Sequence, residues 1–173
     1  MPDTLSLDVK ASMAWLFSEL IQISNVNDNG KLEYSQSLTD GVGADQADVL
    51  FHDERTVGAG ANDDLDLTAL VHSIYGNIVT FSFAKVKVIL LMNLSTTAGD
   101  VLRVGGAGAG LAFATPFNGN ATAVIEAPAD GCLLLVNKKN GWTVTAGTGD
   151  ILRVNNPGAA GITYRIVIAG TKT

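Results

Sequence analysis

The residues of this chain that could do chemistry gather in two short acidic stretches and one glycine run. The first stretch is His52-Asp53-Glu54, whose side chains are types used as metal ligands and as acid–base catalysts. Neighbouring residues of an extended strand point to opposite faces, so these three side chains cannot converge on one ion without a bulge. We therefore interpret the stretch as a solvated strand end.

The second acidic stretch, Asp63-Asp64-Leu65-Asp66, resembles a calcium-binding loop in charge alone. It lacks the Asp-x-Asp-x-Asp-Gly pattern and the distal glutamate that complete such a loop. Paired carboxylates at Asp45/Asp48 or Asp63/Asp66 could serve a glycan-cleaving enzyme. In this polar, loop-rich context they are more typical of solvated connections.

The glycine run Gly105–Gly110 could suggest a phosphate-binding loop, but its context is wrong. No Gly-Lys-Ser/Thr follows, the G-x-G-x-x-G spacing is absent, and no helix is expected to begin there. The chain also has no Gly-x-Ser-x-Gly elbow, and Cys132, His52 and His72 share no local catalytic signature. The sequence thus predicts no catalytic residue, no cofactor-binding residue, no metal ligand and no cofactor, and a protein that is not an enzyme.

The composition restricts the partners and the surroundings. Only 16% of the 173 residues are charged, against about 25% in an average protein, and 47% are hydrophobic. A net charge of −6 argues against a nucleic-acid partner. The longest apolar run, residues 86–92, contains Lys87 and is too short to cross a membrane, and no signal peptide is evident. We expect synthesis in a cytoplasm and no contact with a membrane.

The single cysteine, Cys132, excludes an internal disulfide and is predicted to be a small buried hydrophobe.

The N-terminal residues are ambiguous between helical and strand periodicity, and we favour a strand near residues 13–24. Asn25–Gly30 has the composition of a loop, and Leu32–Leu38 that of a short strand. We therefore divide the chain into residues 1–30, an N-terminal arm or first strand with its loop, and residues 31–173, a single β domain.

The remaining chain alternates strand patterns with turn signals and shows no sustained helix. Residues 69–75 fit one helical turn or an edge segment, and residues 78–93 carry the strongest strand pattern, ending in an unbroken apolar run typical of a strand covered on both faces. About ten to twelve strands at spacings of roughly 8–12 residues predict an all-β fold, an antiparallel β-sandwich or jelly roll. The other expected strands are residues 49–57, 64–68, 101–104, 111–117, 121–126, 132–136, 142–145, 151–154 and 163–168.

One sequence pattern occurs twice, at an offset of 50 residues. Gly99-Asp-Val-Leu-Arg-Val104 returns as Gly149-Asp-Ile-Leu-Arg-Val154, and each copy runs into a loop of small residues, 105–114 and 156–161. We interpret the copies as two equivalent strands of one β architecture. The loops after them would let a neighbouring subunit approach closely, because glycine has no side chain.

Several strings in residues 38–170 resemble, in content and in order, a group of small tailed-bacteriophage virion proteins. The first 37 residues fit this group poorly. The strings are Leu38–Val57, Asp64–Leu67, Phe83–Lys87, Asn93–Ser95, Val104–Ala107, Gly141–Asp150 and Tyr164–Gly170.

The resemblance implies a structural component of the virion, made in the host cytoplasm, and brings no catalytic residues with it. The role it implies is a capsid decoration or cement protein on the head, which binds the major capsid protein and stabilises the shell. We expect a homo-oligomer, with a trimer favoured. The alternative is a tail-fibre or baseplate receptor-binding module that recognises a host surface glycan, where Trp15, Trp142 and Tyr164 could stack on sugars.

Overall fold

The computed structural model describes residues 4–21, 23–74 and 76–172, and nearly all of this chain is β-structure. Every pairing between its strands is antiparallel. The elements are β1 (Leu7–Ile21), β2 (Ser24–Leu38), β3 (Val49–Val57), β4 (Asn62–Asp66), β5 (Leu70–Ile74), β6 (Asn77–Phe81), β7 (Lys85–Asn93), β8 (Val101–Gly105), the 3-10 helix η1 (Thr115–Phe117), β9 (Val124–Pro128), β10 (Cys132–Val136), β11 (Trp142–Thr143), β12 (Ile151–Asn155) and β13 (Ile162–Thr171).

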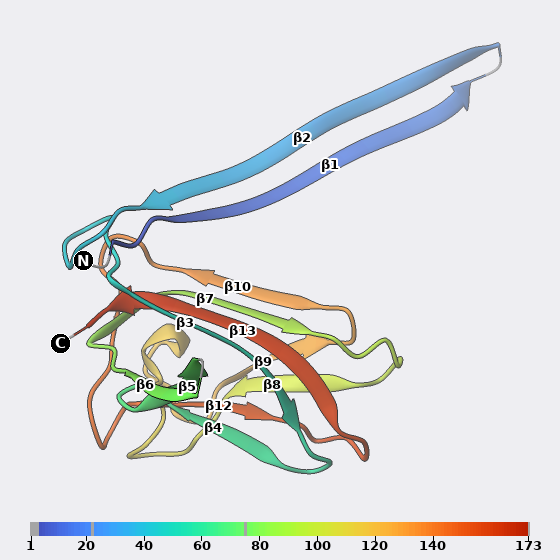
Figure 1. Ribbon diagram of the computed structural model, residues 1–173. Helices are drawn as coiled ribbons and strands as arrows, with labels where there is room; N and C mark the ends of the chain where they lie inside the picture. Colours follow the sequence, from blue (N-terminus) through green and yellow to red (C-terminus); the bar gives the residue numbers. More distant parts are fainter. Residues whose placement is uncertain (1–3, 22, 75, 173) are drawn as a thin grey trace.

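Two sheets stack to form a sandwich (Figure 1). The first has the strand order β10-β7-β13-β3, with β11 also paired to β7, and the second has the order β4-β12-β8-β9. The chain changes sheet between β3 and β4, between β4 and β7 through the separate β5–β6 hairpin, between β7 and β8, between β9 and β10, between β11 and β12, and between β12 and β13. The expected all-β fold, an antiparallel β-sandwich, is confirmed.

The core lies between the inner faces of the two sheets. Leu91 of β7 and Ile166 of β13 meet Leu102 of β8 and Leu152 of β12 there, and all four are buried. On β7 burial extends to the outer face, where Val88 joins a second cluster. The apolar run of β7 is therefore covered on both faces, as its sequence predicts.

The repeated sequence pattern forms the two central strands of the second sheet. β8 and β12 pair with each other, and Val104 lies opposite Val154. Arg103 reaches Glu126 on β9 at 2.9 Å, and the equivalent Arg153 reaches Asp64 on β4 at 2.7 Å. The interpretation as equivalent strands is confirmed. Because the strands are antiparallel, the glycine-rich loops after them leave from opposite ends of the sheet.

The most prominent element outside the sandwich is a long β-hairpin, β1 and β2, which we call the arm (Figure 1). Its strands pair continuously from Leu7 opposite Leu38 to Ile21 opposite Ser24. Fifteen residues per strand give it a length of about 50 Å. The boundary expected after residue 30 lies inside β2.

The expected loop at Asn25–Gly30 is wrong, because these residues belong to β2. Gly30 lies opposite Trp15, and a side chain at Gly30 would place its Cβ 2.2 Å from the indole ring. The missing side chain at Gly30 therefore leaves room for the Trp15 ring on the opposite strand. The ring in turn shields the backbone of the glycine. The alternate asparagines Asn25, Asn27 and Asn29 lie on one exposed face, so their polarity does not oppose a strand there.

Other local expectations are also corrected. Residues 111–117 form no strand: Ala112 makes one bridge to Ile151, and Pro116 lies within η1. Of the two alternatives for residues 69–75, the structure shows the strand, β5, with Tyr75 outside the described residues. Residues 78–93 contain two strands, β6 and β7. Cys132 is exposed rather than buried, because it begins edge strand β10 on the outer face of the first sheet.

The root of the arm packs on the outer face of the first sheet. Val9 and Leu38 of the arm are buried there with Ala47, against Val88 of β7 and Ala169 of β13. This outer cluster is separate from the main core, and it attaches the arm to the sandwich through apolar contacts.

Buried Lys87 of β7 fixes the connection between the arm and the sandwich. Its ammonium group donates hydrogen bonds to the backbone carbonyls of Gly43 and Gln46, the latter at 2.7 Å. Burial lowers the pKa of Lys87, and the nearby charge of Lys85 lowers it further. The two carbonyls satisfy the buried amine, so residues 39–48 are held against β7 and the direction of the arm is set.

We expect Lys87→Met to loosen this connection, because the carbonyls of Gly43 and Gln46 lose their buried donor. The free energy of unfolding should fall by about 1–3 kcal/mol in a denaturant titration. Hydrogen exchange should also accelerate in residues 39–48. The control is Lys85→Met at an exposed neighbouring position. Unchanged exchange in residues 39–48 of Lys87→Met would contradict this role.

Candidate functional site

The two faces of the arm differ in character. Side chains alternate between the faces, and residues opposite each other in the register share one face. One face, which we call the apolar row, is mostly hydrophobic. Its hydrophobic members are Leu7, Val9, Ala11, Met13, Trp15 and Phe17 on β1 with Leu38, Tyr34, Leu32 and Val26 on β2, and Glu19, Asp28, Gly30 and Gln36 lie on the same face.

Beyond its root, the apolar row is uncovered. Met13 is 69% exposed, Phe17 62% and Leu32 70%, and nine of the sixteen exposed large hydrophobic side chains among the described residues lie between Met13 and Tyr34. Fully burying such a side chain contributes about 1.5–3 kcal/mol, and a two-stranded hairpin is marginal by itself in water. A contiguous exposed apolar surface of this kind marks an interaction site.

The outer half of the arm exposes large apolar side chains on both faces, among asparagines on one face and Glu19 and Asp28 on the other. Leu16 and Leu20, 70% and 71% exposed, point away from the apolar row, and Ile23 lies fully exposed in the turn. We call residues 15–26 the arm tip. Nearer the root the second face is polar, with serines, Lys10, Lys31 and Glu33.

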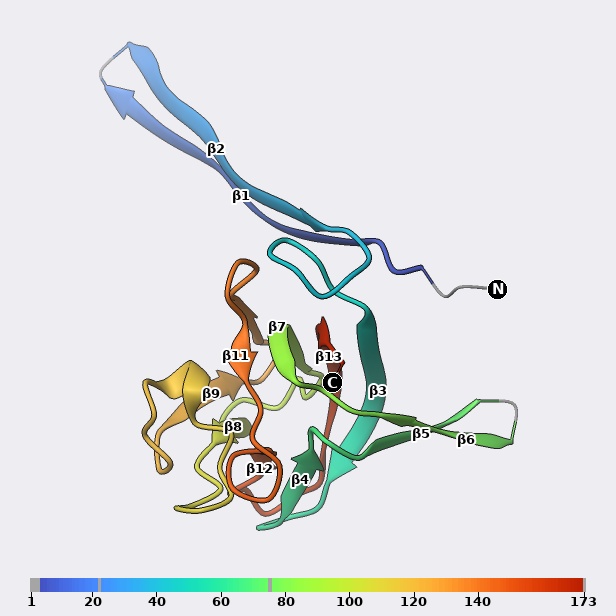
Figure 2. The ribbon, with the colours of Figure 1, turned by 90° about the vertical axis from the view of Figure 1, so that its left-hand side faces the viewer.

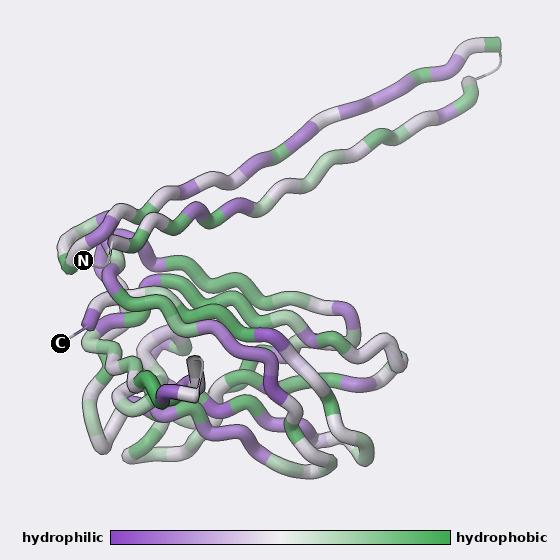
Figure 3. The backbone as a smooth tube through the Cα atoms, viewed as in Figure 1, coloured by the Kyte–Doolittle hydropathy of each residue, from purple (hydrophilic) through white to green (hydrophobic). Residues whose placement is uncertain are grey.

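An apolar groove lies where the arm leaves the sheet. It has a volume of about 270 Å³. Leu7 and Val9 form the arm side of it, and Val88, Leu90, Leu134 and Val167 on the outer face of the first sheet form the other side; Asp8 and Lys10 complete its lining. Figure 3 shows the hydrophobic strands β10, β7 and β13 on the side of the sandwich nearest the arm. Both walls of the groove are therefore apolar.

A second, shorter hairpin, β5 and β6, projects from a different side of the sandwich (Figure 2). Its inner face packs on β3: the ring of Phe81 lies 5.8 Å from that of Phe51, edge to face. Val71 and Ile78, 55% and 78% exposed, point away from the sandwich. It exposes fewer apolar side chains than the arm.

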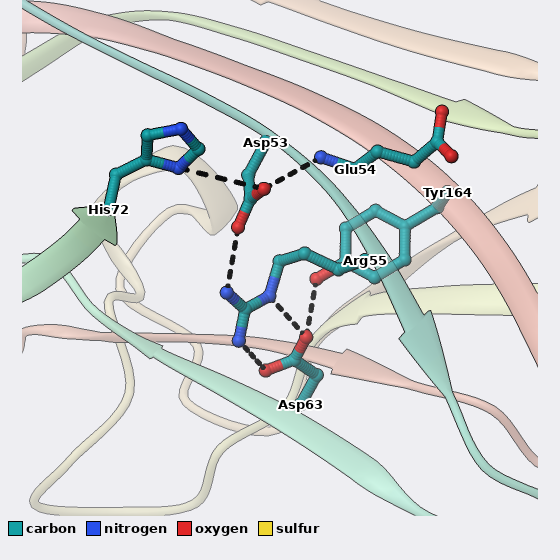
Figure 4. Close-up of polar contacts among 6 residues, drawn as sticks. All are labelled: Asp53, Glu54, Arg55, Asp63, His72 and Tyr164. Carbon is teal, nitrogen blue, oxygen red and sulfur yellow. Dashed lines mark hydrogen bonds and ion pairs between the residues drawn. The ribbon is translucent and has the colours of Figure 1, made fainter. Parts of the chain in front are cut away.

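Asp53 and Asp63, two of the acidic residues singled out in the sequence, belong to a network that joins the two sheets (Figure 4). The guanidinium of Arg55 on β3 donates two hydrogen bonds to Asp63 on β4, at 2.6 and 2.9 Å, and one to Asp53 at 3.0 Å. Tyr164 of β13, wholly buried, donates its hydroxyl to Asp63 at 2.9 Å. The network therefore connects β3 and β13 of one sheet to β4 of the other.

Two titratable groups of this network are held in their ordinary protonation states. The hydrogen bonds of Arg55 to Asp63 raise the pKa of the guanidinium. Burial raises the pKa of the Tyr164 hydroxyl, and the charge of Asp63 raises it further. Neither shift brings a group toward neutral pH, so the network is suited to holding strands together and not to proton transfer.

His52 and Glu54 point outward from β3, while Asp53 points inward, as expected for a strand. The His72 ring lies 5.9 Å from the His52 ring, and its Nδ1 lies 3.8 Å from Asp53. Among the described residues, no group of three or more His, Cys, Asp or Glu is placed to hold a metal ion.

The other sequence candidates do not converge either. Asp64 pairs with Arg153 on the outside of the second sheet, whereas Asp66 accepts hydrogen bonds from Thr68. The amide of Gly108 in the glycine run donates to the carbonyl of Ala121, and Gly105 packs against Phe117. These carboxylates and glycines thus have structural partners within the fold.

Trp142, half-buried, packs against the core, and Tyr164 lies inside it, so neither presents a free face for a sugar. The arm was not predicted as an interaction surface. The signal was the alternation of apolar residues at Val9, Met13, Trp15 and Phe17, which overlaps a helical spacing that includes Leu16 and Leu20.

No protein-family model matches the chain, and no curated protein is significantly similar to it in sequence. Within residues 4–21, 23–74 and 76–172, no helix is long and apolar enough to span a membrane.

The Tyr164 hydroxyl predicts a measurable sensitivity to alkali. Because its pKa is raised in the folded state, its contribution to stability is present below the unfolded-state pKa near 10 and is lost as the pH rises above it. Above pH 10 the wild type should lose up to about 1.4 kcal/mol more per pH unit than Tyr164→Phe.

Denaturant titrations between pH 7 and 11.5 measure this difference. At pH 7, Tyr164→Phe should be about 1 kcal/mol less stable, because the hydrogen bond to Asp63 is lost. Tyr34→Phe on the exposed arm is the control. Parallel pH profiles for the wild type and Tyr164→Phe would contradict the burial argument.

Proposed function

We propose that this chain is a non-enzymatic structural protein of a bacteriophage virion, a decoration protein that binds the major capsid protein on the head and stabilises the shell. The observation that carries the proposal is the arm, which exposes an apolar row beside a sandwich that already has a complete core. An exposed apolar element attached to a folded domain is suited to binding another subunit.

Two further observations support a role in assembly. Arg55, Asp63 and Tyr164 are residue types that can take part in catalysis, but here they make contacts that hold strands together. The outer face of the first sheet also exposes apolar side chains, among them Met92 at 39%. The resemblance of residues 38–170 to small virion proteins supports a virion as that assembly. Cement proteins stabilise a shell by repeating small contacts under symmetry.

The alternative, a tail-fibre or baseplate module that binds a host glycan, gains less support. Of the three aromatic residues that could stack on sugars, Trp142 and Tyr164 pack in or against the core. The Trp15 ring lies over Gly30 across the hairpin, with Met13, Phe17 and Leu32 as its apolar neighbours on the same face.

Electron microscopy of phage particles, with gold-labelled antibody raised against this chain, tests the proposal. We expect label at regular density over the whole head, because a decoration protein occupies equivalent sites on a symmetric shell. Label confined to the tail end would favour the glycan-binding alternative. Particles without label would overturn a virion role, with pre-immune antibody as the control for background.

A further inference from the structure

We infer that the arm tip of one copy of this chain binds in the apolar groove of a second copy, so that the arms join neighbouring subunits. The inference names one partner of the proposed shell protein, and in that sense it rests on the proposed function. The arm, the groove and the charges that they carry support it.

The groove and the arm tip are two surfaces of the same chain that fit each other. The groove has two apolar walls, Leu7 and Val9 of the arm root on one side and Leu90 and Leu134 of the sheet on the other. An occupant therefore needs apolar side chains on two faces. The arm tip has them, with Phe17 on one face and Leu16 and Leu20 on the other. Asp28 lies opposite Phe17, and asparagines lie opposite the two leucines.

The arm cannot cover its own apolar row. Val9 and Leu38 at the root are buried against the sheet, but Met13, Phe17 and Leu32 farther along the same face are more than 60% exposed. Figure 1 shows the arm diverging from the sheet beyond its root. The groove and the uncovered row form one continuous surface that begins inside the outer cluster.

The charges on the arm and around the groove also affect this contact. The whole chain carries a net charge of −6, so contacts between copies require surfaces with few acidic groups. The charged residues of the outer half of the arm are Glu19 and Asp28, and both lie on the face of Phe17. Lys10 at the neighbour's groove offers the opposite charge, beside Asp8. In this outer half the face that carries Leu16 and Leu20 has no charged residue, so it enters the groove without desolvating a charge of its own.

The natural cysteine allows a direct test by disulfide trapping. Cys132 lies on the outer face of β10, one step beyond the groove residue Leu134. The double variant Phe17→Cys/Cys132→Ser, which has a thiol only on the arm tip, is mixed with wild-type chain and oxidised. We expect a disulfide-linked dimer of twice 18.0 kDa on a non-reducing gel whose digest contains a peptide that joins the Phe17→Cys site to Cys132. Homodimers of either chain have the same mass but cannot contain this peptide.

The matched control is Ser73→Cys/Cys132→Ser, which places an exposed thiol on the other projecting hairpin. It should give only background heterodimer. Equal heterodimer yields from the Phe17→Cys and Ser73→Cys chains would overturn the inference, because the linkage would then reflect random collision.

Sedimentation velocity gives a second readout that needs no thiol. The wild type should form oligomers in increasing proportion as its concentration rises, and Phe17→Ser/Leu20→Ser should sediment as a monomer with an unchanged circular dichroism spectrum. Val71→Ser/Ile78→Ser on the β5–β6 hairpin is the control and should behave like the wild type. A wild type that is monomeric throughout, or a tip variant that associates normally, would overturn the inference.

These outcomes are separate from those of particle labelling. Labelled heads with a monomeric chain in solution would overturn arm exchange and leave the decoration role standing. A trapped heterodimer with no label on particles would do the reverse.

Discussion

The packing of the arm root on the outer face of the first sheet is the contact on which the rest of the molecule's surface depends. Val9 and Leu38 are buried there against Val88 and Ala169. Buried Lys87 holds the adjoining loop to the same strand that carries Val88. Together these contacts direct the arm away from the sandwich, so the remainder of the apolar row is left without a cover from its own chain.

This arrangement separates two tasks within one short chain. The sandwich has its own core, with the Arg55–Asp63–Tyr164 network connecting its sheets, and it does not need the arm to bury Leu91 or Leu152. The arm gains stability only when its apolar row is covered, since a two-stranded hairpin buries little by itself. An arm of one copy in the groove of the next is a head-to-tail contact, and such contacts close into rings when the rotation between copies permits.

The sandwich could be predicted from the sequence because its strands obey simple patterns. β3, β10 and β12 lie where alternation and turn residues indicate them, and the repeated Gly-Asp pattern correctly predicts that β8 and β12 are equivalent. Local failures came from contacts between residues distant in sequence. Gly30 indicates a turn in the local sequence. The residue that requires a glycine there, Trp15, lies fifteen residues earlier in the chain. Cys132 reads as buried because the sequence does not reveal that β10 lies at a sheet edge.

The arm was the hardest element to predict, since no core imposes its pattern. Its residues Leu16 and Leu20 interrupt the alternation and create a helical spacing. In a strand that packs on a core they would be misplaced, but on a projecting hairpin they add apolar side chains to the second face of the tip. The feature that confuses the prediction of secondary structure is thus the feature that suits the tip to a groove with two apolar walls.

Hydrogen–deuterium exchange of the full chain, followed over a range of protein concentrations, tests most directly whether the arm is completed by another copy. The account predicts that amides of β1 and β2 beyond the root exchange rapidly in dilute solution and become protected as the concentration rises. Amides of the sandwich strands should exchange at the same rate throughout. Arm amides that are equally protected at every concentration would contradict the account, because the apolar row would then be satisfied within a single chain.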